Sequence, residues 1–441
     1  MTPPAPPRFG QHLPARPIRR LTAPVRRFLA VEAASGFVLL GCTVAALAVA
    51  NSPLAGAARD FWETHLVVGV GRWRLDEPLH FWVNDALMAV FFFVVGLEVK
   101  REAVAGELAD PRTAALPVVA AVGGMLVPAG VYLLLAGGGP AARGWGVPMA
   151  TDIAFVVGLL ALFGRRVPLG LKVFLLSLAI VDDVGAVLVI AAFYSGGTDP
   201  NMLGLAAAGL GACVGLGRLG VRAVGVYVLV GAGVWLATLR GGVHPTLAGV
   251  LLGLITPSRP LVGATALRLG MADLLADVQE NRDDPPELEE LHLLRFAARE
   301  AVSPLERLED ALHPWVGFVV LPLFALANAG VAVRPAAALD PVAVAVACGL
   351  ALGKPLGIVG FGLLAVRLGL ARLPAGVRPR TLVGAGCLGG VGFTMSLFVA
   401  GLAFPGDPAR LAAAKVGILA GSGLGGLLGG LVLWRTLPRG G

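Results

Sequence analysis

The stretch that decides the fold is residues 168–195, which read PLGLKVFLLSLAIVDDVGAVLVIAAFYS. An apolar run of this length can cross a bilayer as a helix, because a crossing takes about 20 residues. Two adjacent acids, Asp182 and Asp183, stand at its midpoint. An ionisable group at membrane depth is costly unless it is paired or hydrated, so this pair predicts a functional site.

The rest of the chain has the same apolar character. Of its 441 residues, 56% are hydrophobic and 14% are charged, whereas a soluble domain has about 45–50% apolar and about 25% charged residues. This composition excludes a soluble protein, which could not cover so much apolar surface, and a disordered chain, which needs low hydrophobicity. The net charge of +7 would suggest a nucleic-acid partner in a soluble protein. In a membrane protein it indicates basic cytoplasmic loops instead, so we expect a lipid bilayer and no nucleic acid as partner.

Apolar runs along the chain predict an all-α polytopic membrane protein with about twelve spans. Basic residues gather in the connections on the same side as the N-terminus, which places both termini in the cytoplasm. We expect one transporter domain over 28–434, between a basic tail at 1–27 and a short tail at 435–441. The runs cover roughly residues 28–50, 80–99, 113–136, 148–163, 168–195, 201–217, 222–239, 244–257, 312–333, 341–366, 381–404 and 409–434.

Two connections are longer than simple turns. Residues 63–78 alternate around a Val-Gly turn, which predicts a small external β-hairpin, with an irregular loop as the alternative. Residues 258–310 form a long acidic connection, which we expect to be mostly a solvated cytoplasmic loop. Within it, residues 287–299 are amphipathic.

Asp152 and Lys354 are the other ionisable residues deep inside predicted spans. Lys354 is at the midpoint of the run 341–366, so it and the aspartate pair are expected near the bilayer midplane, where secondary transporters bind their ions. Adjacent residues on a helix point about 100° apart. One aspartate can therefore line an ion cavity while its neighbour reaches Lys354. A buried Asp–Lys pair that only locks two helices together is the structural alternative, but it leaves two acids unexplained.

The fourth and eleventh spans are interrupted. Pro148 precedes Thr151 and Asp152 in the fourth span, and the eleventh has five glycines within residues 384–392. Interrupted segments in corresponding places are a strong indication of a transporter site, although glycines also serve close helix packing. Spans 4 and 11 cross in opposite directions, which predicts an inverted repeat of spans 3–5 and 10–12 with discontinuous helices 4 and 11. Asp152 and Lys354 could neutralise the charges of the helix ends that meet there.

Several motifs resemble the NhaA family of bacterial Na⁺/H⁺ antiporters, and they occur in order over about residues 30–434. The resemblance implies an electrogenic, pH-regulated antiporter of the bacterial inner membrane that expels Na⁺ or Li⁺ in exchange for H⁺. It implies a transporter for sodium and pH homeostasis, not an enzyme, with no cofactor. The motifs are WVNDALMAVFFFVVGLEVKRE from residue 82, ATDIAF from 150, AIVDDVGA from 179, LHPW from 312, LPLFALANAG from 321, GKPLG from 353 and GGVGFTMS from 389.

The resemblance also implies roles for individual residues, carried over by position. Asp183 is implied as the principal cation ligand and proton carrier, Asp182 as its partner, and Lys354 as the basic residue that pairs with Asp182. Together the two aspartates would hold the transient Na⁺. Thr151 and Asp152 match the extended chain where helices 4 and 11 cross, with Asp152 compensating the helix dipoles.

The family's pH-sensing cluster at the cytoplasmic mouth has counterparts here, and the external hairpin matches the element through which family members form homodimers. Asp310 stands where better-studied members have a histidine. Histidine titrates in the physiological range and aspartate ordinarily does not, so the pH of activation is expected to differ. A solvated, charged helix end is the alternative interpretation of this cluster, which comprises Glu98, Arg101, Glu102, Glu309, Asp310 and His313.

Two other functions fit less of the sequence. An intramembrane aspartyl protease needs a Gly-x-Gly-Asp motif, which the sequence lacks, and would leave Lys354 without a role. Another cation- or organic-anion-coupled secondary transporter of the same inverted-repeat architecture is the closer alternative.

Overall fold

The computed structural model describes residues 32–70, 73–221, 223–280, 288–332 and 335–437. The predicted tail at 1–27 and most of the predicted tail at 435–441 lie outside the described residues. In chain order, the helices and strands are α2 (Glu32–Ala50), α3 (Ala55–Trp62), β1 (His65–Val70), β2 (Trp73–Pro78), α4 (Leu79–Phe81), η2 (Trp82–Leu87), α5 (Met88–Ala105), α6 (Pro111–Ala136), η3 (Gly139–Met149), α7 (Ile153–Ala161), η4 (Gly164–Arg166), α8 (Leu169–Phe193), α9 (Pro200–Arg218), α10 (Val224–Arg240), α11 (Thr246–Ile255), α12 (Ala264–Glu280), α13 (Leu288–Glu300), α14 (Pro304–Trp315), η5 (Val316–Val320), α15 (Leu321–Asn328), α16 (Pro335–Ala338), α17 (Pro341–Cys348), η6 (Gly349–Gly353), α18 (Lys354–Arg367), α19 (Pro379–Gly389), α20 (Phe393–Ala403) and α21 (Pro408–Thr436).

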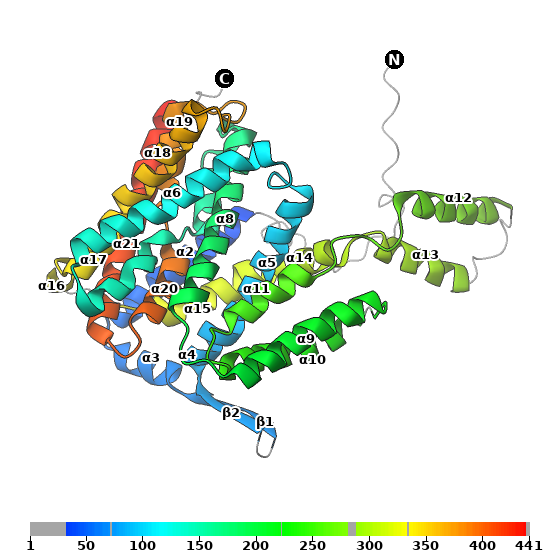
Figure 1. The fold of residues 1–441 in the computed structure, drawn as a ribbon, viewed down its shortest axis with the longest axis horizontal. Helices are drawn as coiled ribbons and strands as arrows, with labels where there is room; N and C mark the ends of the chain where they lie inside the picture. The colour runs from blue at the N-terminus through cyan, green and yellow to red at the C-terminus, as the bar shows by residue number, and fades with distance from the viewer. Residues whose placement is uncertain (1–31, 71–72, 222, 281–287, 333–334, 438–441) are drawn as a thin grey trace.

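Most of the helices form one bundle, from which two elements project (Figure 1). The strands β1 and β2 pair antiparallel, from His65 opposite Pro78 to Val70 opposite Trp73. This hairpin extends from the end of the bundle opposite α19, and it confirms the hairpin predicted over 63–78. The helices α12 and α13 lie side by side away from the bundle. The acidic connection predicted over 258–310 therefore contains α12, α13 and the start of α14.

The structure is that of a mostly helical, multi-pass membrane protein. Among the described residues, seven helical segments are long and apolar enough to cross a membrane. Three further pairs of helices meet at a bend: 116° between α2 and α3, 43° between η3 and α7, and 45° between α19 and α20. Counting each pair as one span gives up to ten, while α10 and α11 are shorter apolar helices.

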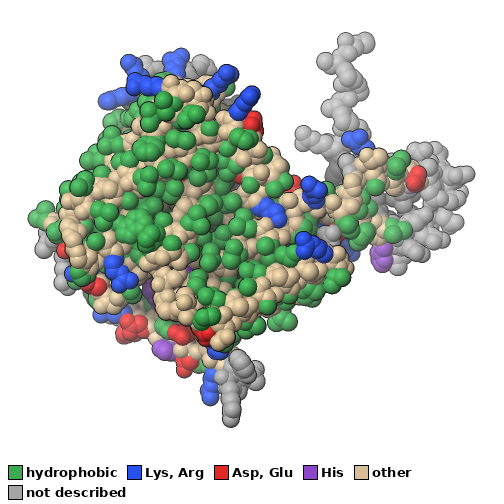
Figure 2. Space-filling model, in the orientation of Figure 1, with side chains coloured by type: hydrophobic (Ala, Val, Ile, Leu, Met, Phe, Trp, Pro, Cys, Tyr) green, Lys and Arg blue, Asp and Glu red, His purple; other side chains and the backbone are tan. Residues whose placement is uncertain are grey.

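Charged side chains gather at the two ends of the bundle. Figure 2 shows hydrophobic side chains over its middle, Lys and Arg at the end formed by α18 and α19, and acidic side chains at the end that carries the hairpin. A broad apolar belt between charged ends is the surface expected of a protein that lies across a bilayer.

The helix that carries Lys354 packs closely against α6. A Cβ atom on Gly357 of α18 would lie 2.6 Å from the carbonyl carbon of Gly123 and 3.0 Å from the amide nitrogen of Gly124, so only glycine fits. Small residues let helix backbones approach in this way inside a membrane. The contact packs α18, which begins at Lys354, directly against α6.

Candidate functional site

The breaks in two helix pairs meet in the middle of the bundle. Residues 150–152 join η3 to α7, and residues 390–392 join α19 to α20. The N–H of Asp152 donates to the carbonyl of Val391 at 2.7 Å, and the Thr151 hydroxyl donates to the carbonyl of Gly389 at 3.0 Å. These bonds hold the two connections against each other.

Asp152 caps two helices at once. Its Oδ1 accepts from the N–H of Phe155 in α7 at 3.1 Å. Its Oδ2 accepts from the N–H of Thr394 in α20 at 2.9 Å and from the Thr394 hydroxyl at 2.5 Å. A carboxylate is favoured at a helix N-terminus, where unpaired N–H groups and the helix dipole leave partial positive charge. One buried carboxylate therefore serves the N-termini of both α7 and α20.

Lys354 serves the opposite kind of helix end. Its ammonium donates to Asp182 Oδ2 at 2.5 Å and to the carbonyl of Met149, the last residue of η3. Lys354 has no exposed surface and Asp182 is 1% exposed. The amine thus forms an ion pair with a carboxylate of α8 and also donates a hydrogen bond to the C-terminal carbonyl of η3, where a helix carries partial negative charge.

Asp183 is buried beside this pair but does not join it. Its side chain is 1% exposed, and its Oδ1 has no hydrogen-bond partner among the described residues; the same is true of Asp182 Oδ1. The charged groups that interact electrostatically with Asp183 are Asp182, Glu98, Asp152 and Lys354. Buried polar atoms are usually satisfied, so two bare carboxylate oxygens on neighbouring residues need an explanation. Carboxylate oxygens are ligands that hard cations prefer, and they also bind protons.

At one end of the site, α5 and α14 are joined by an ion pair between Arg101 and Glu309. Arg101 Nη2 also lies 3.5 Å from Glu102 Oε1. Asp310 and His313 are exposed on α14, and both interact electrostatically with the Glu309 carboxylate. The structure therefore brings Arg101 and Glu102 of α5 close to Glu309 of α14, while Glu98, the other predicted mouth residue of α5, acts on Asp183.

Sequence reasoning missed some partners in the site. Thr394, which donates to Asp152, lies in the GGVGFTMS motif, but the sequence predicted no role for it. The carbonyl of Met149 could not be found from residue types, because it is a backbone atom placed by the bend between η3 and α7. Hydroxyl residues directly after a helix break were the one signal that could have identified Thr394.

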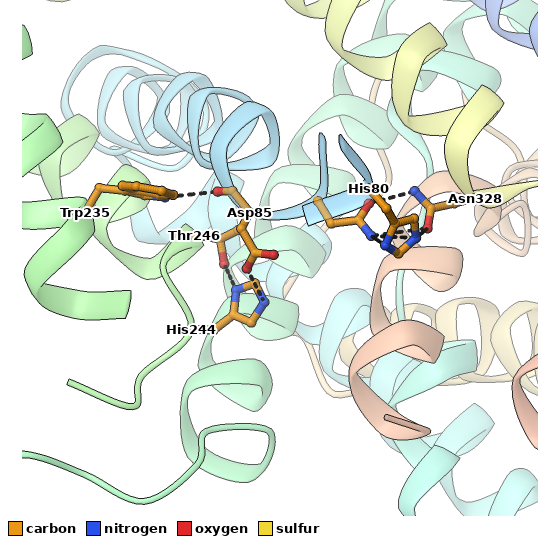
Figure 3. Close-up of polar contacts among 7 residues, drawn as sticks. His80, Asp85, Trp235, His244, Thr246 and Asn328 are labelled. Carbon is orange, nitrogen blue, oxygen red and sulfur yellow. Dashed lines mark hydrogen bonds and ion pairs between the residues drawn. The ribbon is translucent and has the colours of Figure 1, made fainter. Parts of the chain in front are cut away.

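A partly buried polar pair on η2 was also missed. Asp85 Oδ1 lies 3.5 Å from His244 Nε2, and His244 Nδ1 is 2.8 Å from the Thr246 hydroxyl (Figure 3). The indole N–H of Trp235 donates to the backbone carbonyl of Asp85 at 3.0 Å. Asp85 stands inside a predicted span, so the rule that selected Asp152 would have found it. These contacts tie η2 to α10 and to the start of α11.

A second polar group on the same segment, also drawn in Figure 3, ties η2 to α15. Asn328 donates to Asn84 Oδ1 at 2.7 Å, and its Oδ1 lies 3.2 Å from His80 Nε2. Its amide nitrogen also donates to the carbonyl of Phe324 at 3.0 Å. Together the two groups hold the hairpin end of this span against three neighbouring helices.

The chain is similar to known proteins over almost its whole length. The model of a family described as Na⁺/H⁺ antiporter 1 matches residues 26–433. A Na⁺/H⁺ antiporter NhaA of Rhodopirellula baltica is 50% identical over 435 residues, which are 97% of each chain. Proteins of the same name from Oleidesulfovibrio alaskensis and from an Anaeromyxobacter species are 49% and 48% identical, with 96% or more of each chain covered.

Proposed function

The chain belongs to the Na⁺/H⁺ antiporter family, and from this we propose that it expels Na⁺ or Li⁺ from the cytoplasm in exchange for protons. The observation that carries the proposal is Asp183, a buried carboxylate with a bare oxygen next to a second carboxylate that is paired with Lys354. A cation and a proton compete for such a group, because each neutralises the same negative charge. Alternating access then converts the competition into exchange.

The two aspartates and Lys354 divide the work of the cycle. In the proton-loaded state, Lys354 neutralises Asp182 and a proton neutralises Asp183. A cation that binds both carboxylates takes the place of Lys354, so the amine must leave Asp182 when the cation enters. Electrogenic exchange needs a second proton besides the one that Asp183 releases, and the Lys354 amine, once it has left Asp182, is the group that can release it. Thr151 and Asp152 hold the crossing of the two broken helices beside the cation.

The same proposal includes a membrane topology. It has twelve spans over 28–434, with both termini cytoplasmic in the bacterial inner membrane. The basic side chains at the α18–α19 end support a cytoplasmic position for that end (Figure 2). Spans 3–5 and 10–12 would form the inverted repeat, because η3–α7 and α19–α20 bend by similar angles of 43° and 45°. The external hairpin exposes Leu66, Val67 and Val68, and we propose that a homodimer forms through it.

Everted membrane vesicles that contain the protein test the proposed exchange. Addition of NaCl or LiCl is expected to collapse a preformed pH gradient, and KCl is expected to have no effect. Vesicles from the same host without the protein are the control. A gradient that collapses with an organic anion and not with Na⁺ or Li⁺ would instead identify the alternative secondary transporter.

We further propose that the mouth residues Glu98, Arg101, Glu102, Glu309, Asp310 and His313 regulate exchange by pH. The support is the Arg101–Glu309 ion pair, which joins α5 to α14 and lies near two exposed titratable side chains. If His313 is protonated, it can pair with the Glu309 carboxylate and so compete with Arg101 for it. Protonation at this end can therefore change how α5 and α14 are joined.

Asp310→His is expected to make exchange more dependent on pH between pH 6 and 8. A histidine at this position gains positive charge as the pH falls through about 6.5, whereas aspartate keeps its charge over that range. The ratio of the exchange rate at pH 6 to that at pH 8 should be at least twofold lower in the variant than in the parent. Asp310→Asn is the matched control, since it removes the charge without adding a group that titrates. Superimposable activity–pH curves for the histidine variant and the parent would contradict a sensing role.

A further inference from the structure

The span that carries Lys354 is not a continuous α-helix. It consists of α17, a π-helical turn over Gly349–Gly353 (η6) and α18. The backbone N–H of Lys354 donates to the carbonyl of Gly349, five residues back, where an α-helix would use Leu350. Such turns are rare and are frequent at functional sites. The apolar run 341–366 predicted one uninterrupted helix, so the π turn is a finding of the structure.

The π turn leaves one backbone carbonyl without a donor at either helical spacing. The α-helical donor for Leu350 O would be the N–H of Lys354, which is used by Gly349. The π-helical donor would be residue 355, which is proline and has no N–H. The Leu350 carbonyl lies against the break in the α19–α20 pair, where a Cβ on Gly390 would lie 2.4 Å from Leu350 O. An acceptor for Lys354 is therefore available one residue from the acceptor now used.

The surroundings of the turn allow it to change its winding. On its inner side, a Cβ on Gly349 would lie 2.7 Å from Pro148 Cβ, and one on Gly353 would lie 2.8 Å from Pro128 Cα. Glycine faces proline at both of these positions, whereas Leu350, inside the turn, is fully buried in the core. On its outer side, Leu352 is 56% exposed on the surface of the protein. If Leu350 stays in place, a change of winding moves only Ala351, Leu352 and Gly353, and the one large side chain among them is exposed.

Lys354 itself cannot leave by a simple rotation of its side chain. Its ammonium is fully buried and held by Asp182 and by the Met149 carbonyl. Interiors are close-packed, so a long side chain without exposed surface needs a movement of the backbone that carries it. The backbone immediately before Lys354 is the π turn.

We propose that Gly349–Gly353 is a conformational hinge of transport, in which the Lys354 N–H moves from Gly349 O to Leu350 O and releases the Lys354 amine from Asp182. The exchange replaces one hydrogen bond by another, so no bond is lost. A register change of one residue corresponds to about 100° of rotation and 1.5 Å along the axis, more than enough to break a 2.5 Å ion pair. The inference rests on the proposed function in one respect: the transport cycle must separate Lys354 from Asp182.

Structures of the wild-type protein in two states test the hinge directly. One is determined at acidic pH without Na⁺ or Li⁺, and the other at alkaline pH with saturating Li⁺. The expected result is the π turn with Lys354 on Asp182 in the first, and a Lys354 N–H bond to Leu350 O with the amine displaced in the second. A displaced amine above an unchanged π turn would overturn the hinge and leave the proposed function intact. An amine that stays on Asp182 with Li⁺ bound would overturn both the hinge and the proposed role of Lys354.

Deletion of Leu352 tests the same hinge by activity. Removing one residue from the π turn leaves a continuous α-helix, while α18 keeps its contact with α6 and Lys354 keeps its place. The maximal exchange rate should fall at least tenfold, with the apparent KM for Na⁺ within twofold of the parent. Leu352→Ala, which alters the same exposed position without shortening the helix, is the matched control and should exchange like the parent. A deletion variant with a normal thermal transition and a normal rate would refute the hinge, and for one that fails to fold the two-state structures decide.

Discussion

Asp183→Asn is expected to abolish exchange, with at least a hundredfold fall in the rate at which Na⁺ or Li⁺ collapses a pH gradient. Asparagine keeps the size of the side chain but cannot carry the negative charge that binds a cation or exchanges a proton. Asp183 is buried and its Oδ1 has no hydrogen-bond partner among the described residues. The substitution therefore removes the negative charge from the proposed cation site itself. Everted vesicles with matched amounts of protein provide the measurement.

Two controls make this result specific. Asp60→Asn, on the exposed surface of α3, removes the same charge far from the site and should leave exchange unchanged. Binding of Li⁺ by calorimetry should be lost in Asp183→Asn and retained in Asp60→Asn. An Asp183→Asn protein that exchanges as fast as the parent would show that Asp183 is not the cation ligand.

The second large effect is expected on stability, from Lys354→Met. Removing the amine leaves Asp182 buried without its partner and the Met149 carbonyl without its donor. Breaking a buried ion pair from one side costs about 3–5 kcal/mol, because a buried charge is left uncompensated. A lower temperature of thermal unfolding in detergent, followed by tryptophan fluorescence, measures this loss.

The double variant Asp182→Asn with Lys354→Met distinguishes the ion pair from simple packing. It removes both charges, so part of the lost stability should return relative to Lys354→Met alone. Neither variant is expected to exchange normally, since both change the proposed cation site. If the two substitutions destabilise the protein additively, the pair has no special energetic role and the interpretation of Lys354 fails.

Much of the architecture could be predicted because it depends on local composition. Where the structure describes them, the apolar runs coincide with a helix or with consecutive helices, and the Val-Gly hairpin is present as β1 and β2. Charges are costly in lipid, so their scarcity in the spans identified Asp182, Asp183 and Lys354 as candidates without any structure. Proline before Asp152 and the glycines at 384–392 likewise coincide with the two bends of about 45°.

Other features could not be predicted because they depend on contacts between distant residues. The second helix end that Asp152 caps is at Thr394, 242 residues away. The Asp85–His244 pair joins η2 to the turn that precedes α11. Side-chain types in one segment do not state which distant segment will pack beside it. The residues alone left open which aspartate meets Lys354, and the packing of α8 against the crossing put Asp182 there.

The sequence by itself determined that this chain crosses a membrane and which few charges lie inside its spans, because the cost of burying charge in lipid is independent of the fold. Only the tertiary structure decided how those charges are arranged. The π turn before Lys354 is the clearest case, since hydropathy is the same for an α-helix and a π turn. Which carbonyl accepts the Lys354 N–H depends on the packing of η6 against α6 and the crossing, and on Pro355, which has no N–H to offer.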